Sequence, residues 1–305
     1  MKIEDGEING HRYGSVALIG RPNAGKSTLL NNLVGEKIAI VTDKPQTTRT
    51  RIMGVVTGQG WQMAIYDTPG IHKPKDRLGR TMMQTATDVL GWVDVIYYIT
   101  DAAGGFGSGE ARIIQLLESV TQPVFLLLNK VDLMEKQALL PVIDAYRDKR
   151  EFAHIFPLSA LTGEGVPELL AATAACFQEG PPCFDEDEMT DQTERVLIAE
   201  LIREKAILAS REEVPYAIAV YVEKMENRRQ DLMDIHAVIV VEQPGQKGIL
   251  IGKQGKVLKQ IGSEARKDIE ALLGVRVNLQ LWVRTRKDWR NKEAYLKEYG
   301  LAGFS

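Results

Sequence analysis

The chain has 305 residues, 44% of them hydrophobic and 26% charged, and a formal net charge of −3. This length suggests two domains, because a single core usually stops growing before that size, and the composition is typical of a soluble globular protein. No apolar run approaches the roughly 18 residues that would cross a bilayer, and the polar start "MKIEDGEINGHRYG" is unlike a secretory signal. Cys176 and Cys183, without further cysteines or partnering histidines, predict reduced thiols, so we expect a cytoplasmic protein.

Short apolar stretches alternate with amphipathic ones between residues 15 and 160. Strands are expected at 15–20, 61–67, 93–100, 123–130 and 155–160. Strands that are apolar on both faces and alternate with helices predict an α/β domain with a mostly parallel sheet and helices on both faces. In this architecture ligands bind at the carboxyl ends of the strands.

The stretch "GRPNAGKST" follows the first expected strand and precedes a helical stretch, which is the context of a phosphate-binding loop. Its glycines free backbone N–H groups to surround phosphates at a helix N-terminus. Lys26 would reach the β- and γ-phosphates, and the Ser27 hydroxyl would ligate Mg²⁺. The expected loop consists of Gly20, Arg21, Pro22, Asn23, Ala24, Gly25, Lys26, Ser27 and Thr28.

The tetrapeptide "DTPG" ends the strand at 61–67, about forty residues after this loop. Asp67 is expected to hold Mg²⁺ through a water, and the N–H of Gly70 to face the γ-phosphate, with Thr68 and Pro69 between them. The next residue, Ile71, stands where Ras-like enzymes carry a water-positioning glutamine. An aliphatic side chain can neither orient the attacking water nor take its proton, so we expect slow intrinsic hydrolysis.

Two further strand ends predict the base. The motif "NKVD" comprises Asn129, Lys130, Val131 and Asp132. The Asp132 carboxylate can accept two hydrogen bonds from guanine, whereas adenine would leave it buried and unpaired. The following strand ends at Ser159, Ala160 and Leu161, where a backbone N–H can reach the guanine O6. The predicted ligand is therefore GTP or GDP.

Residues 42–51, "TDKPQTTRTR", lie between the two phosphate motifs and resemble a loop that orders around Mg²⁺ and the γ-phosphate. Thr48 is our choice for the second hydroxyl ligand of Mg²⁺, with Thr47 as the rival. Asn23 stands where similar GTPases use an asparagine to bind K⁺, whose charge could replace an arginine finger. Asn23 could equally just cap the loop. Lys26, Thr48, Gly70 and Asn23 are the expected catalytic residues.

Composition changes at "EGPPCFDEDEMTD", where paired prolines and an acidic cluster indicate a linker. We expect a GTPase domain at 1–180, a linker at 181–190 and a second domain at 191–305 with a C-terminal tail. Asp191 resembles the start of the first helix of this second domain. The order of elements that follows is α-β-β-α-α-β.

Within this unit "GKQG" forms a G-x-x-G loop between two helical stretches. The order of elements and this loop resemble a KH domain of the prokaryotic topology, in which the loop clamps about four single-stranded nucleotides. Eleven basic against four acidic residues give residues 243–290 a charge of +7, which fits a phosphate backbone. Trp282 is expected in the core rather than stacked on bases. The expected RNA-binding residues are Gly252, Lys253, Gln254, Gly255, Lys256, Lys259 and Arg266.

The motifs "GRPNAGKST", "PQTTRTR" and "DTPG" resemble those of the Era family of ribosome-assembly GTPases, and the KH-like unit extends the resemblance over nearly the whole chain. It implies a monomeric GTPase that acts in small ribosomal subunit maturation and binds near the 3′ end of 16S rRNA. It also implies weak peripheral association with the inner membrane. Two alternatives stay open: an RNA-binding assembly factor with a static nucleotide site, and a small-molecule kinase or ATPase, for which "NKVD" is the wrong base reader.

Overall fold

The structure is a computed structural model that describes residues 10–185, 187–229 and 231–302. The chain divides into two compact units. The first contains Met1–Ile38, Thr50–His72 and Met83–Asp191, and the second contains Ala39–Arg49, Lys73–Met82 and Gln192–Ser305. Two segments that lie early in the sequence therefore pack with the C-terminal unit, which a single linker near residue 185 did not predict.

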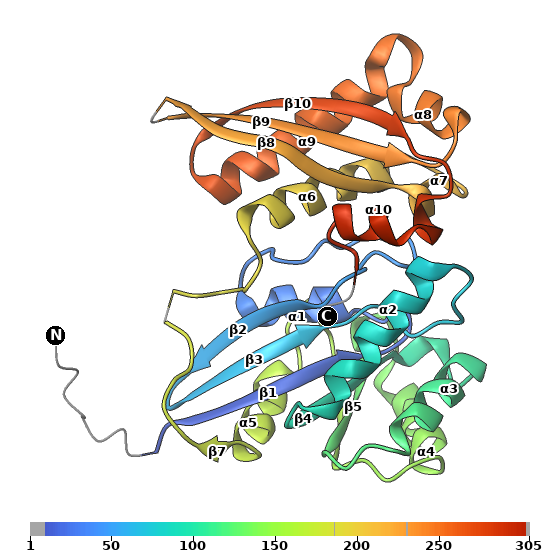
Figure 1. Cartoon of the computed structure of the whole chain (residues 1–305). Coiled ribbons are helices and arrows are strands. Elements are labelled where there is room, and N and C mark those ends of the chain that lie inside the picture. The colour runs from blue at the N-terminus through green and yellow to red at the C-terminus, as the bar shows by residue number, and fades with distance from the viewer. Residues whose placement is uncertain (1–9, 186, 230, 303–305) are drawn as a thin grey trace, which may run out of the picture. The chain divides into compact units, whose positions relative to one another are not determined.

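The first unit is built on a sheet with the strand order β2-β3-β1-β4-β5-β6 (Figure 1). Strands β1, β3, β4, β5 and β6 are parallel, which confirms the expected α/β class, while β2 is antiparallel to β3 and β7 to β1. Strand β2 was not predicted from the sequence. The strands are β1 Arg12–Ile19, β2 Ile52–Gly58, β3 Trp61–Asp67, β4 Val95–Asp101, β5 Val124–Asn129, β6 His154–Leu158 and β7 Gln178–Glu179.

Helices cover both faces of this sheet. Helices α2, α3 and α4 contribute buried side chains to the core on one face, and α1 and α5 contact β1 and β3. The bounds are α1 Lys26–Val34, α2 Arg77–Asp88, α3 Ser108–Leu117, α4 Leu139–Arg147 and α5 Val166–Ala175. Strands β1, β3, β4 and β5 are buried over most of their length, as the apolar runs predicted, whereas β6 is largely exposed or half-buried. The loops at the carboxyl ends of the buried strands are attached to a rigid platform.

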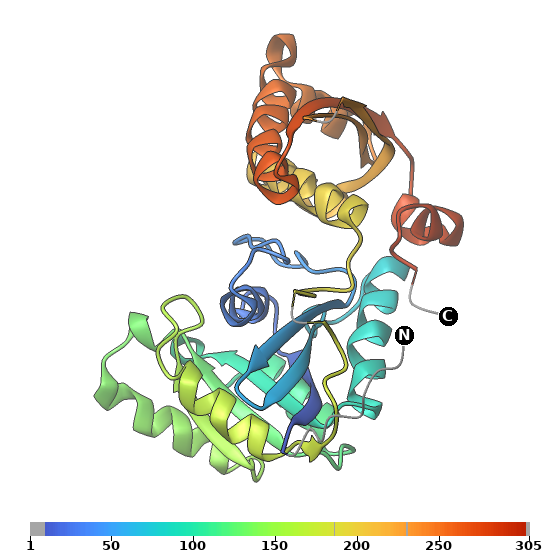
Figure 2. The same cartoon turned by 90° about the vertical axis from the view of Figure 1, so that its left-hand side faces the viewer.

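The second unit contains a three-stranded sheet in the order β10-β9-β8, visible at the top of Figure 2. Strand β9 is parallel to β10 and antiparallel to β8. Helices α6 and α9 pack on one face of this sheet. The elements are α6 Glu194–Leu208, α7 Val214–Ala217, β8 Ala219–Arg229, β9 Leu232–Val241, α8 Pro244–Ile251, α9 Lys256–Leu273, β10 Arg276–Thr285 and α10 Glu293–Glu298.

Several details of this unit differ from the expectation. Helix α6 begins at Glu194 with Thr193 as the preceding residue, whereas Asp191 belongs to the first unit and forms an ion pair with Arg51 there. The helix after the G-x-x-G loop, α9, runs without interruption from Lys256 to Leu273. The segment Lys73–Met82 joins this unit because Leu78 and Met82 pack with Trp289 and other apolar side chains of the C-terminal region. Within the described part of the chain, no helix of either unit is both long and apolar enough to cross a bilayer.

Candidate functional site

The loop between β1 and α1 wraps around the amine of Lys26. Helix α1 begins at this lysine because Gly25 has a φ of 103°, a left-handed conformation that glycine adopts without strain. The lysine is 5% exposed, and its Nζ donates to the carbonyl of Arg21 at 3.0 Å. Burial lowers the pKa of Lys26, and the carboxylate of Asp67 opposes that shift. A buried cation of this kind suits a phosphate ligand, which would supply the missing negative charge.

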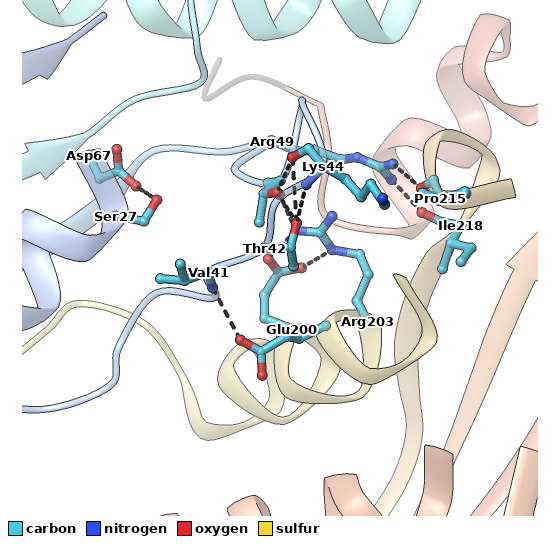
Figure 3. A network of polar contacts seen from close by, with 12 residues as sticks. Ser27, Val41, Thr42, Lys44, Arg49, Asp67, Glu200, Arg203, Pro215 and Ile218 are labelled. Carbon is cyan, nitrogen blue, oxygen red and sulfur yellow. Dashed lines mark hydrogen bonds and ion pairs between the residues drawn. The ribbon is translucent and has the colours of Figure 1, made fainter. Parts of the chain in front are cut away.

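Ser27 and Asp67, two of the three expected Mg²⁺ ligands, lie together. The Ser27 hydroxyl donates to the Asp67 carboxylate at 2.6 Å, at the left of Figure 3. A hydroxyl and a carboxylate are oxygen donors that Mg²⁺ prefers. Within the described residues no group of three or more His, Cys, Asp or Glu side chains could hold a metal ion. Such a pair fits Mg²⁺ because this ion is usually held by one or two carboxylates, waters and substrate phosphates.

The "DTPG" loop packs directly on the phosphate-binding loop. The Thr68 hydroxyl donates to the carbonyl of Leu18 at 2.7 Å, and the N–H of Ile71 donates to the carbonyl of Gly20 at 2.9 Å. Gly70 lies so close that a Cβ would be 2.6 Å from the nitrogen of Pro22. Ile71 is 4% exposed and belongs to the core of this unit. Its side chain therefore does not reach a water at the phosphates.

Asn129 joins the phosphate-binding loop to the loop that was expected to read the base. Its Nδ2 donates to the carbonyl of Ala24 at 2.7 Å, and its Oδ1 accepts from the N–H of Ala160 at 2.8 Å. Asp132 and Leu161, two of the residues expected to lie at the base, are exposed at the surface. The structure therefore brings the "NKVD" and "SAL" loops together through one buried amide.

Two acidic residues that the sequence analysis missed complete this site. Asp101, at the carboxyl end of β4, accepts from Lys130 at 2.7 Å, and the buried Glu110 accepts from Arg21 at 3.2 Å. The position of Asp101 at a strand end was a signal that could have identified it. Together with neighbouring residues they surround a hollow of about 200 Å³ that is lined by Arg21, Pro22, Asn23, Ala24, Thr100, Asp101, Gly104, Glu110 and Lys130.

Thr48, the third expected Mg²⁺ ligand, belongs to the second unit and is 7% exposed. Its segment, Ala39–Arg49, is held by hydrogen bonds to side chains of helix α6 and to carbonyl groups of α7 (Figure 3). Glu204 accepts from the N–H of Val41 at 3.1 Å, and Arg203 donates to the carbonyl of Thr47. The three expected ligands are therefore divided between the two compact units, with Ser27 and Asp67 in the first and Thr48 in the second.

Further contacts order the same segment. The rival ligand Thr47 shares a hydrogen bond of 2.7 Å with the hydroxyl of Thr42 and donates to the carbonyl of Lys44 at 2.8 Å. Arg49 is 4% exposed and donates to the carbonyls of Ile218 at 2.5 Å and Tyr216 at 3.1 Å. These contacts end α7, because they satisfy carbonyl groups that a helix leaves without an internal partner.

The second phosphate-binding motif joins α8 to α9. Gly252 has a φ of 70°, and a Cβ there would lie 2.4 Å from Val257, so the turn requires glycine. Lys253, Gln254, Lys256 and Lys259 are exposed around it. Beside the loop is a groove of about 450 Å³, lined by Gly255, Leu258, Lys259, Gly262, Ser263, Arg266, Leu279 and Leu281. Of the expected RNA-binding residues, Gly255, Lys259 and Arg266 line this groove, and the others belong to the adjoining loop.

The two tryptophans of this unit differ. Trp289 is fully buried and donates through Nε1 to the carbonyl of Ala217 at 2.9 Å. Trp282 is 41% exposed and contacts the ring of His236 edge to face. The expectation that Trp282 lies in the core was wrong, because alternate residues of β10 point to opposite sides of the sheet and α9 covers only one.

A phosphate-binding loop on a mostly parallel sheet, with loops for Mg²⁺ and guanine beside it, defines the class: a P-loop GTPase domain followed by a KH domain. The family models agree, since residues 15–130 match "50S ribosome-binding GTPase" and residues 213–290 match "KH domain". The GTPase Era of Lacticaseibacillus paracasei is 48% identical over 290 residues, covering 95% of this chain and 97% of the relative. The chain belongs to the Era family of GTPases.

Two solved structures are similar over the whole fold. One is a crystal structure of Era in complex with MgGDPNP and nucleotides 1506–1542 of 16S ribosomal RNA, 40% identical with a TM-score of 0.93. The similarity covers 96% of this chain and 99% of that one. The other is a point variant of Aquifex aeolicus Era bound to GDP.AlF4⁻, also 40% identical, with a TM-score of 0.92 and coverage of 95% of this chain and 99% of that chain.

Proposed function

We propose that this GTPase uses Mg²⁺ with GTP and GDP and binds single-stranded rRNA near the 3′ end of 16S rRNA during assembly of the small ribosomal subunit. The observation that carries the RNA part is the groove beside the "GKQG" loop, with its exposed lysines and apolar floor. The Era structure with MgGDPNP and a 16S fragment supports both ligands. The proposed location is the cytoplasm, with a minor peripheral contact at the inner membrane, and the proposed state is a monomer.

The site residues have distinct proposed roles. Lys26 and the N–H of Gly70 bind the terminal phosphate, and Ser27, Thr48 and Asp67 hold Mg²⁺, which supplies charge stabilisation when bound. Asp132 recognises guanine, while Ser159, Ala160 and Leu161 close the base site. Asn23 binds K⁺ or maintains the loop conformation. The proposed domain limits are 1–180, 181–190 and 191–305.

We propose that the nucleotide controls RNA binding through Ala39–Arg49, in which Thr48 directly follows the Thr47 that α6 holds. In the GTP form this segment would contact the nucleotide, and helix α6 would compete with that contact. Release of the γ-phosphate would remove the contact with the nucleotide. The buried Ile71 supports a slow intrinsic rate, so RNA or the small subunit is expected to stimulate turnover.

The test is to measure GTP hydrolysis and RNA retention in one preparation. The wild-type chain should prefer GTP and GDP over ATP and should retain an RNA with the sequence of nucleotides 1506–1542 named for the Era complex. The double variant Lys253→Ala/Lys256→Ala should lose most RNA retention while it keeps guanine-nucleotide affinity. A preference for ATP, or full RNA retention by the double variant, would contradict the proposal.

A further inference from the structure

A second cavity of about 420 Å³ lies in the KH unit, at the opposite end of α9 from the "GKQG" loop. It is lined by Arg229, Asp231, Leu232, Arg266, Glu270, Arg276 and Val277. Arg266 also lines the groove beside the "GKQG" loop, so the two cavities are neighbours. This second cavity plays no part in the function proposed above.

Helix α9 connects the two cavities along one face. The residues that line them recur at intervals of three or four along the helix, from Gly255 through Ser263 to Glu270. Residues at this spacing share one side of an α-helix, and the fifteen rises of about 1.5 Å from Gly255 to Glu270 span roughly 22 Å. Strand β10 runs back along the same path, with Arg276 and Val277 at the far cavity and Leu279 and Leu281 beside the groove.

The chemistry changes along this path. The end near the "GKQG" loop has the apolar floor of Leu258, Leu279 and Leu281, which suits bases. The far end has three arginines, and within the described residues none of their side chains forms an ion pair or a hydrogen bond. Two acids share the cavity, of which Glu270 already accepts from the N–H of Val277 at 2.9 Å. Three guanidinium groups against two carboxylates leave a positive site that can bind a phosphate.

Resting on the proposed RNA binding, we propose that Arg229, Arg266 and Arg276 form a second phosphate-binding site for RNA that continues past the four-nucleotide clamp. A KH loop holds only about four nucleotides, so a longer strand must leave the groove at one end. At the arginine end of α9 the RNA strand would meet guanidinium groups instead of apolar surface. The site is a backbone contact and carries no base specificity.

The test compares two RNA lengths on the full chain. One RNA is an oligomer of about four nucleotides, the length of the clamp, and the other has the sequence of nucleotides 1506–1542 named for the Era complex. Arg229→Ala and Arg276→Ala should each weaken binding of the longer RNA several-fold. Each should also reduce the slope of log affinity against log salt by ~0.7, the value for one single-strand phosphate contact. Neither should change binding of the short oligomer.

Arg228→Ala is the matched control. Arg228 is the neighbour of Arg229 in β8 and is also exposed, but its side chain pairs with Asp234 at 3.9 Å and does not line the cavity. Its removal should leave both RNAs bound as before. Thermal unfolding of each variant should match the wild type, because the substituted side chains are exposed.

Four outcomes would overturn the inference. Equal losses for both RNA lengths would place the arginines in the clamp itself, and an equal loss in Arg228→Ala would show only a general charge effect. A loss restricted to anionic phosphatidylglycerol vesicles, with RNA binding unchanged, would assign the site to a lipid headgroup. If Lys253→Ala also leaves RNA binding unchanged, the proposed function fails, and the second site fails with it.

Discussion

Asn129 shows how one side chain can position two loops. It is 2% exposed, and its amide donates to the phosphate-binding loop while it accepts from the loop at Ala160. A carboxylate of the same shape keeps the acceptor and loses the donor. The carbonyl of Ala24 would then face another oxygen inside the protein, which is costly because neither group is solvated.

We therefore expect Asn129→Asp to weaken GTP and GDP binding alike, by about five- to a hundred-and-fiftyfold, the equivalent of the ~1–3 kcal/mol for an unsatisfied buried group. Titration with fluorescent guanine nucleotides would measure the change. Asn32→Asp makes the same substitution at an exposed position of α1 and should have no effect. Unchanged affinity in Asn129→Asp would show that the two loops do not depend on this amide.

Asn23 has a φ of 64°, a left-handed conformation that asparagine adopts more readily than most residues. This geometry supports a conformational role, which is the alternative to a role in binding K⁺. Glycine distinguishes the two, because it keeps the left-handed conformation and removes the side-chain oxygen.

If the side chain binds K⁺, wild-type turnover should be several-fold faster in KCl than in NaCl at equal ionic strength, and Asn23→Gly should abolish that difference. The loss follows because the cation would no longer be held beside the phosphates. Asn23→Ala, which cannot adopt the conformation easily, should be slow in both salts. Equal wild-type rates in the two salts, or a K⁺ response that survives in Asn23→Gly, would remove the ligand role.

At the scale of elements, helix α6 holds Ala39–Arg49 with two adjacent residues. Arg203 is 2% exposed and lies between the carbonyl of Thr47 and the carboxylate of Glu200, and Glu204 accepts from Val41. Both contacts are made with the backbone, so they fix the path of the segment rather than the identity of its side chains. Thr48 lies between the anchored Thr47 and Arg49 and moves only when they do.

Arg203→Ala should release this segment and destabilise the second unit by ~1–3 kcal/mol, since it leaves the partly buried carbonyl of Thr47 without this donor. Native-state hydrogen exchange should report faster exchange across residues 39–49. The control Arg195→Ala removes an exposed arginine of the same helix and should leave that exchange unchanged. Protection of residues 39–49 that persists in Arg203→Ala would mean that other contacts hold the segment.

At the scale of the whole molecule, the phosphate-binding loop and the "GKQG" loop belong to different compact units. Ala39–Arg49 packs with the second unit, although in the sequence it lies between two phosphate motifs of the first. If this segment responds to both the nucleotide and the KH unit, binding at one site must change affinity at the other. Linkage requires the two changes to be equal. The free energy involved is that of releasing or ordering the segment.

RNA should therefore tighten GTP binding by the same factor by which GTP tightens RNA binding, and about five- to a hundredfold is the usual range. Calorimetric titrations of each ligand in the presence and absence of the other would measure both factors. In Arg203→Ala both factors should move toward one. Equal affinity of the wild-type chain for RNA in its GDP and GTP forms would contradict the coupling.

The sequence alone predicted the parallel sheet and most residues of the two sites, because these sites are built from short continuous motifs. "GRPNAGKST", "DTPG", "NKVD" and "GKQG" each join a strand or helix to the next element, so their residues are close in space whatever the rest of the chain does. The apolar runs likewise predicted the parallel sheet, because a strand buried on both faces needs no distant partner to be recognised.

Only the tertiary structure decided which residues meet from distant parts of the sequence. Neither the pairing of Arg21 with Glu110 nor the packing of Ala39–Arg49 on α6 has a local signal. The exposure of Trp282 depends on which face of β10 the helix α9 covers. The arginine cavity depends on the ends of β8, β9 and β10 meeting the C-terminal half of α9. Spacing along the chain determines local geometry, whereas burial and pairing between distant residues are set by how the elements pack.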